Sequence, residues 1–274
     1  MALQAPSPER VDTPLGAIAY RSSGDAARVS HVLLHGIGSA SASWQAQLDW
    51  ARGRTDVRLL AWDAPGYGLS SALESAWPQA GDYGQRLWAW LDALGVRTPV
   101  VLVGHSLGAI MAAGAALQQP PRVQGLVLLS PARGYGDAPE AERTRMVQSR
   151  LSSLQQLGPA GMAQARAAAM LSPQARPEWI EAVRRNMAAI DPAGYTQAVH
   201  LLARARLTQD LAALKLPVQV ASGEADTITA PAACDEVAAA AGVRRLSLGP
   251  VGHACAIEAA DAVCRLLVAQ PLES

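Results

Sequence analysis

One short segment constrains the fold of this chain more than any other, because it places a serine in a tight turn between a strand and a helix. The four apolar residues 100–103 are typical of a short strand that is buried on both faces. The motif Gly-x-Ser-x-Gly follows at residues 104–108, and the small, apolar residues 109–117 predict a closely packed helix. Both glycines suit a turn without room for Cβ atoms, so we expect the side chain of Ser106 to be presented at its tip.

A serine hydroxyl becomes a nucleophile only beside a general base that is itself oriented by a third group. Two histidines follow Ser106 in the chain, and His253 lies in a glycine-rich loop directly after an expected strand at residues 244–248. The other, His200, lies in an apolar pattern of helical period, which is typical of a packed or surface histidine. His253 is therefore the predicted base.

The orienting carboxylate is expected at the end of another strand, since open parallel sheets assemble their sites there. Residues 217–221 predict such a strand, and Asp226 lies in the loop that follows it. Glu224 is the competing carboxylate two residues earlier, and we expect it to be a solvated loop charge. The predicted catalytic residues are thus Ser106, Asp226 and His253, in that order along the chain.

This order and the setting of the serine resemble the α/β-hydrolase family, and the resemblance covers nearly the whole chain. His35 and Gly36, which end an expected strand at residues 30–36, are similar to the family's His-Gly loop. The resemblance implies an oxyanion hole formed by the backbone N–H groups of Ile37 and Leu107.

Three further polar residues in these motifs admit a catalytic and a structural interpretation. Asp63 begins a segment, residues 63–70, that resembles the family's Asp-x-Pro-Gly-x-Gly-x-Ser turn, and stabilisation of that turn is its expected role. We expect His35 to shape its loop rather than act as a second base. His105, next to the serine, is expected to be a packing and hydrogen-bonding neighbour.

Short apolar strands alternate with amphipathic helices, which predicts an α/β fold with a mostly parallel central sheet and helices on both faces. Residues 132–208 interrupt this alternation with helical patterns alone. The predicted domains are therefore an α/β-hydrolase core of residues 1–131 and 209–274, and a helical cap of residues 132–208 between strands 6 and 7. The expected strands are at residues 10–21, 30–36, 57–62, 100–104, 123–129, 217–221 and 244–248, and the expected core helices at 41–52, 83–94, 107–118, 231–241 and 255–269.

The charge of the chain restricts its partners. The formal net charge is zero, which argues against nucleic acid or an anionic membrane surface and leaves a small-molecule substrate. No apolar run is long enough to span a bilayer, and residues 1–10 lack an apolar segment of the signal-peptide type, so we expect a cytoplasmic protein. The three cysteines show no metal-ligand spacing and are expected to be free thiols, and the predicted chemistry needs no metal or cofactor.

The expected cap is more cationic than the rest of the chain. Residues 132–208 contain ten arginines and six acidic residues, a formal charge of +4. A cationic lid would favour a substrate that carries a carboxylate, through a bidentate arginine contact. The alternative is that these arginines lie on solvated helix faces.

The predicted activity is hydrolysis of a small carboxylic ester or lactone through an acyl-serine intermediate. The chain partially resembles the 3-oxoadipate enol-lactonases and the carbon–carbon hydrolases of aromatic meta-cleavage products. It departs from the second group at residues 37–39 and at Ala254, and from the first at residues 106–109, which read Ser-Leu-Gly-Ala. Two alternatives stay open: a carbon–carbon bond hydrolase, and a slow-turnover small-molecule receptor on the same fold.

Overall fold

The centre of the protein is one eight-stranded sheet in the order β1-β2-β4-β3-β5-β6-β7-β8, in a computed structural model that describes residues 7–269. Strands β1 and β2 are antiparallel to their neighbours, and every pairing from β4 to β8 is parallel. The predicted mostly parallel α/β sheet is thereby confirmed. The strands are β1 (Glu9–Val11), β2 (Ile18–Ser23), β3 (His31–Leu34), β4 (Leu59–Trp62), β5 (Val100–His105), β6 (Val123–Leu129), β7 (Val218–Ser222) and β8 (Leu246–Ser247).

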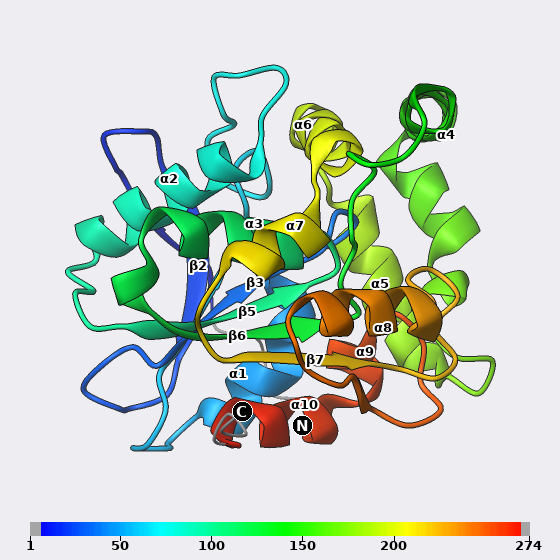
Figure 1. Ribbon diagram of the computed structural model, residues 1–274. Coiled ribbons are helices and arrows are strands. Elements are labelled where there is room, and N and C mark those ends of the chain that lie inside the picture. Colours follow the sequence, from blue (N-terminus) through cyan, green and yellow to red (C-terminus); the bar gives the residue numbers. More distant parts are fainter. Residues whose placement is uncertain (1–6, 270–274) are drawn as a thin grey trace.

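Helices cover both faces of this sheet (Figure 1). Successive buried side chains of its strands point to opposite sides, so each face has its own apolar cluster. In β3, Val32 and Leu34 join the apolar cluster under α2, α3, α7 and α8, whereas Leu33 joins the cluster under α1, α9 and α10. The helices of the core are η1 (Ser41–Trp44), α1 (Gln45–Ala51), α2 (Ala80–Ala93), α3 (Leu107–Gln118), η2 (Pro120–Arg122), α7 (Leu207–Ala213), α8 (Pro231–Ala240), α9 (Cys255–Glu258) and α10 (Ala260–Val268).

The N-terminal region differs from the sequence prediction. A single strand over residues 10–21 was expected, and the structure instead has β1 and β2 with a turn between them. The Thr13 carbonyl accepts a hydrogen bond from the Gly16 N–H (3.0 Å), the Thr13 hydroxyl donates to the Gly16 carbonyl (2.7 Å), and Gly16 has a φ of +109°. This glycine conformation reverses the chain, so that β1 pairs with β2 rather than extending it.

Between β6 and β7 the described chain forms helices and connecting loops but no strand, and α4 and α6 lie together at one end of the molecule (Figure 1). Helix α4 bends at Gly158 (φ 62°, ψ 175°), directly before Pro159, whose ring does not fit the interior of a straight helix. α7 packs against α3 and α8, on the sheet. The helices of the insertion are α4 (Glu140–Arg166), η3 (Ala168–Met170), α5 (Pro177–Ala188) and α6 (Pro192–Arg204).

Some sequence predictions extend beyond the described part of the chain. Residues 1–6 and 270–274 of the predicted core, and most of the stretch considered for a signal peptide, lie outside it. Within residues 7–269, no helix combines the length and apolar character needed to cross a membrane, and no group of His, Cys, Asp and Glu side chains is arranged to hold a metal ion. The three cysteines are buried and free.

Candidate active site

Ser106 occupies the turn between β5 and α3 in a backbone conformation that L-residues rarely adopt, with a φ of 54° and a ψ of −115°. The flanking glycines make this turn possible. A Cβ on Gly104 would lie 2.6 Å from the Ala109 backbone nitrogen, and one on Gly108 would lie 2.1 Å from the Leu34 carbonyl oxygen. Close packing of β3, β5 and α3 therefore holds the turn, and Ser106 lines a cavity of about 650 Å³.

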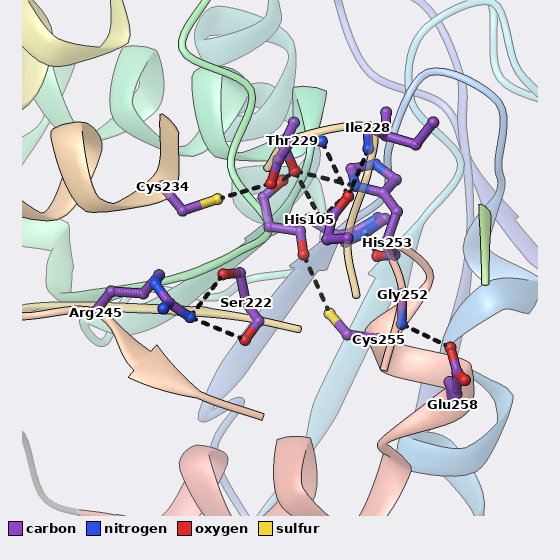
Figure 2. Close-up of polar contacts among 12 residues, drawn as sticks. His105, Ser222, Ile228, Thr229, Cys234, Arg245, Gly252, His253, Cys255 and Glu258 are labelled. Carbon is purple, nitrogen blue, oxygen red and sulfur yellow. Dashed lines mark hydrogen bonds and ion pairs between the residues drawn. The ribbon is translucent and has the colours of Figure 1, made fainter. Parts of the chain in front are cut away.

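His253 and Asp226 form a buried pair beside this cavity. The His253 Nδ1 lies 3.0 Å from the Asp226 Oδ2, and their side chains are 2% and 0% exposed. The Thr229 hydroxyl donates to the same oxygen (2.9 Å), and the backbone N–H groups of Ile228 and Thr229 donate to Oδ1 (2.8 and 3.0 Å; Figure 2). A carboxylate facing Nδ1 favours the tautomer protonated there, which leaves Nε2 as the proton acceptor.

The environment of Asp226 keeps it ionised. Burial alone raises the pKa of this carboxyl group, but the hydrogen bond and charge of His253, together with the N–H groups of Thr229 and Ile228, lower the pKa to about 2. A carboxylate that stays charged at neutral pH can hold the imidazole ring in place and stabilise its protonated form.

The sequence offers two carboxylates, Asp226 and Glu224, as the partner of His253, and the structure distinguishes between them. Glu224 forms an ion pair with Arg245 (3.0 Å), with 44% of its side chain exposed, while Asp226 contacts His253. His200 is also remote from the base, since it packs its ring against Trp77 with a centroid distance of 3.7 Å. Ser106 and His253 line one cavity, and the Ser106 hydroxyl has no hydrogen bond to any described residue.

The backbone N–H groups of Ile37 and Leu107 are both available at the same cavity. Leu107 is the first residue of α3, where a backbone N–H has no partner within the helix. Ile37 follows β3, and its carbonyl accepts a hydrogen bond from the Tyr67 hydroxyl (2.8 Å). Among residues 7–269, no acceptor receives either N–H. Two free donors next to Ser106 are what an oxyanion hole requires.

His35 and Asp63 occupy structural positions, as the sequence indicated. The His35 Nδ1 donates to the Gly36 carbonyl (2.8 Å) and Nε2 accepts from the Ala64 N–H (3.0 Å), so both ring nitrogens are used. Burial lowers the pKa of His35, which keeps the ring neutral. The Asp63 carboxylate accepts from the Ser41 N–H (2.8 Å) and thereby ties two loops together.

His105 contacts the predicted base through its backbone. Its Nε2 donates to the His253 carbonyl (2.8 Å), and the two ring centroids are 4.8 Å apart. Burial, reinforced by the charge of His253, lowers the pKa of His105 to about 3. This neutral ring fixes the backbone of the His253 loop.

Glu258 is a residue of this site that sequence analysis missed. Its carboxylate accepts a hydrogen bond from the Gly252 N–H (2.8 Å; Figure 2). It also accepts hydrogen bonds from the Ser172 N–H (3.0 Å) and from the Ser172 hydroxyl. The Ala254 N–H also donates to the Met170 carbonyl (2.7 Å). The loop that carries His253 is therefore tied on both sides to residues 170–172 in the middle of the helical insertion, and no motif in the sequence marks this connection.

The cavity wall is mixed in character. Apolar and aromatic side chains of the insertion line it, and so do charged side chains from both parts of the chain. Of the ten arginines in residues 132–208, three line the cavity and seven lie elsewhere. The apolar set includes Met162, Met170, Met187, Tyr195 and Leu202; the charged set is Arg133, Arg150, Arg166, Asp137, Glu142 and Glu236.

The sequence matches the family described as "Serine aminopeptidase, S33" (Hydrolase_4) over residues 25–250. It is 31% identical over 247 residues to the putative carbamate hydrolase RutD of Klebsiella pneumoniae (strain 342), in an alignment that covers 84% of this chain and 86% of that protein. These matches extend across the core and the insertion alike.

Solved structures share the whole fold. A hydrolase from Pseudomonas aeruginosa PA01 has a TM-score of 0.81 and 28% identity, and the match covers 97% of this chain and all of that one (100%). The enol-lactonase from Burkholderia xenovorans LB400 has a TM-score of 0.82 at 22% identity, covering 95% and 98% of the two chains, which shows a common fold.

Proposed function

The chain belongs to the α/β-hydrolase superfamily of enzymes, within the family described as serine aminopeptidase S33, and from this premise we propose that it cleaves a small carboxylic ester or lactone through an acyl-serine intermediate. The observation that carries the proposal is the buried His253–Asp226 pair (3.0 Å) on the wall of the cavity that Ser106 also lines. A nucleophile, a base and an orienting carboxylate are the parts that acyl transfer needs.

In the proposed mechanism, Ser106 Oγ attacks the substrate carbonyl carbon while His253 Nε2 accepts the hydroxyl proton. The N–H groups of Ile37 and Leu107 stabilise the oxyanion, and Asp226 stabilises the imidazolium. The imidazolium then donates its proton to the departing alkoxide as the carbon–oxygen bond breaks. In deacylation, His253 deprotonates a water molecule that attacks the acyl carbon. The bond between the acyl carbon and Ser106 Oγ then breaks, the imidazolium returns its proton to this oxygen, and the carboxylic acid is released.

The helical insertion has the position of a cap in this proposal. Met162, Met187 and Tyr195 come from residues 132–208 and line the cavity together with Ser106. Such a cap selects the acyl group by shape and excludes water until a substrate is bound. Its apolar and aromatic side chains favour a small organic substrate.

A carbamate is the second candidate substrate, because the 31% identical relative is described as a putative carbamate hydrolase. The same residues would attack its carbonyl carbon. A panel of short-chain esters, lactones and carbamates tests both candidates, with the purified protein and Ser106→Ala compared side by side. We expect the wild-type protein to turn over at least one of these substrates, and we expect kcat to be lower in Ser106→Ala by a factor of at least about 10³. If the wild-type protein hydrolysed no ester, no lactone and no carbamate, the proposal would be contradicted.

A further inference from the structure

The bend in α4 brings two distant arginines to the same cavity. Arg150 and Arg166 are 16 residues apart, and on a straight α-helix they would be separated by about 24 Å along the axis and by about 160° around it. The chain leaves helical geometry at Gly158, so the two limbs of α4 do not share one straight axis, and both arginines line the cavity that Ser106 also lines. Both side chains are half-buried.

Neither of these two guanidinium groups is neutralised by the protein. In the described part of the chain, Arg150 and Arg166 have no ion pair and no hydrogen bond to another residue. A half-buried guanidinium offers five N–H donors in a planar fork, which fits a carboxylate in two parallel hydrogen bonds.

Two of the three acidic residues of the cavity wall are paired with arginines other than Arg150 and Arg166. Asp137 lies 3.3 Å from Arg206, and Glu236 forms an ion pair with Arg133. Glu142 is exposed in the first turn of α4, where the helix N-terminus favours a negative charge. The charge that the cavity offers to a ligand is therefore positive.

The positive charge of Arg150 also acts on Tyr67, whose hydroxyl contacts Ile37. Burial raises the pKa of the Tyr67 hydroxyl well above its ordinary value, and the positive charge of Arg150 opposes part of that rise. The same hydroxyl donates to the Ile37 carbonyl (2.8 Å). Arg150 and Ser106 line the same cavity, so a carboxylate held by Arg150 and the carbonyl carbon that Ser106 attacks would belong to one bound molecule.

We propose that Arg150 and Arg166 bind a free carboxylate on the substrate, so that the enzyme acts on half-esters or lactones of dicarboxylic acids. This inference rests on the proposed ester and lactone hydrolysis and specifies its substrate class. The sequence left two interpretations of the arginines in residues 132–208, namely carboxylate binding and solvated surface charge. The inference assigns carboxylate binding to Arg150 and Arg166, and surface charge to the arginines that lie outside the cavity.

The test compares matched chromogenic substrates. These are the 4-nitrophenyl monoesters of succinic, glutaric and adipic acid, each paired with the same compound in which the distal carboxyl group is a methyl ester. The quantity measured is the ratio of kcat/KM for the free acid to kcat/KM for its methyl ester. We expect a ratio of about 10 or more for at least one chain length, because a charge-assisted hydrogen bond lost to methylation has an effect of that order.

Two variants and a matched control locate the effect. Arg150→Gln and Arg166→Gln should each lower this ratio about tenfold. Arg145→Gln, at an exposed position of the same helix that does not line the cavity, should keep it. Equal lowering by Arg145→Gln would overturn the inference, because the preference would then come from the general charge of the cap.

The outcomes also separate this inference from the function on which it rests. Hydrolysis of both substrate series with a ratio near one would overturn carboxylate binding and leave ester hydrolysis standing. A preference that disappears on raising the salt from about 0.05 to about 0.5 M would also overturn it, since direct contacts in a half-buried site are screened less than distant charges. Failure to hydrolyse either series would contradict the proposed function itself.

Discussion

The Glu258 carboxylate accepts a hydrogen bond of 2.8 Å from the backbone N–H of Gly252, the residue directly before His253. The same carboxylate accepts hydrogen bonds from the backbone N–H and the hydroxyl of Ser172, which lies between η3 and α5 in the helical insertion. One side chain thus fixes the position of the proposed base relative to the proposed cap.

Replacing this carboxylate tests whether the connection affects catalysis. Glu258→Gln removes the charge and one acceptor oxygen, which weakens charge-assisted hydrogen bonds of about 1.5–3 kcal/mol each. We expect a roughly tenfold loss in kcat with a smaller change in KM, because His253 is displaced while the substrate cavity remains.

The control for this variant is Glu178→Gln, which removes an exposed glutamate of the insertion whose one ion pair within residues 7–269 is with Arg176. It should keep wild-type kcat and thermal stability. If Glu258→Gln lowered the melting temperature but left kcat unchanged, Glu258 would stabilise the fold without positioning the base.

The two carboxylates of the loop after β7 should differ sharply in their contribution. Asp226→Asn replaces the group that contacts His253 Nδ1, and we expect kcat to fall by about 10²-fold or more because the imidazole loses its orientation and its counter-charge. Glu224→Gln removes an exposed partner of Arg245 and should change kcat by less than about twofold. Steady-state kinetics of the two variants decide the assignment, and a larger loss in Glu224→Gln would exchange their roles.

Buried histidines should make the protein sensitive to mild acid. Burial lowers the pKa of His31 from 6.5 to about 4, so that the unfolded chain binds a proton here at a pH where the folded protein does not. The free energy of unfolding rises with pH wherever the unfolded state binds more protons than the folded state. The contribution of neutral, buried His31 to this free energy is therefore complete above pH 6.5, and it is lost as the pH falls from about 6.5 to about 4.

The variant His31→Gln isolates this contribution, because His31 lies at the start of β3, far along the strand from the His-Gly loop. The free energy of unfolding, measured with denaturant at several pH values, should depend on pH less steeply than in the wild type, by up to about 1.4 kcal/mol per pH unit. An unchanged slope between pH 6.5 and 4 would show that His31 titrates normally in the folded protein.

The sequence predicted the proposed catalytic residues because each is marked by local chemistry. Ser106 lies in a spaced glycine motif, and Asp226 and His253 follow apolar strands whose carboxyl ends meet at one edge of a parallel sheet. The alternation of strands and helices likewise predicted the central sheet and the helical insertion between β6 and β7.

Features that depend on tertiary contacts were not predictable in the same way. The bend at Gly158 is visible in the sequence as a Gly-Pro pair. That Arg150 and Arg166 line the same cavity depends on how the two limbs of α4 pack, which the sequence does not give. Glu258 resembles any acid of a C-terminal helix until the fold brings Gly252 and Ser172 to it. Neither arrangement can be predicted from the spacing of residues in the sequence.

The central claim, that Ser106 forms an acyl-enzyme, is tested most directly by intact-protein mass spectrometry after rapid acid quenching during turnover of a 4-nitrophenyl ester. The account predicts a mass increase equal to the acyl group in the wild-type protein, mapped by peptide analysis to Ser106, and no increase in Ser106→Ala. An adduct on another residue, or full turnover by a folded Ser106→Ala variant, would contradict it.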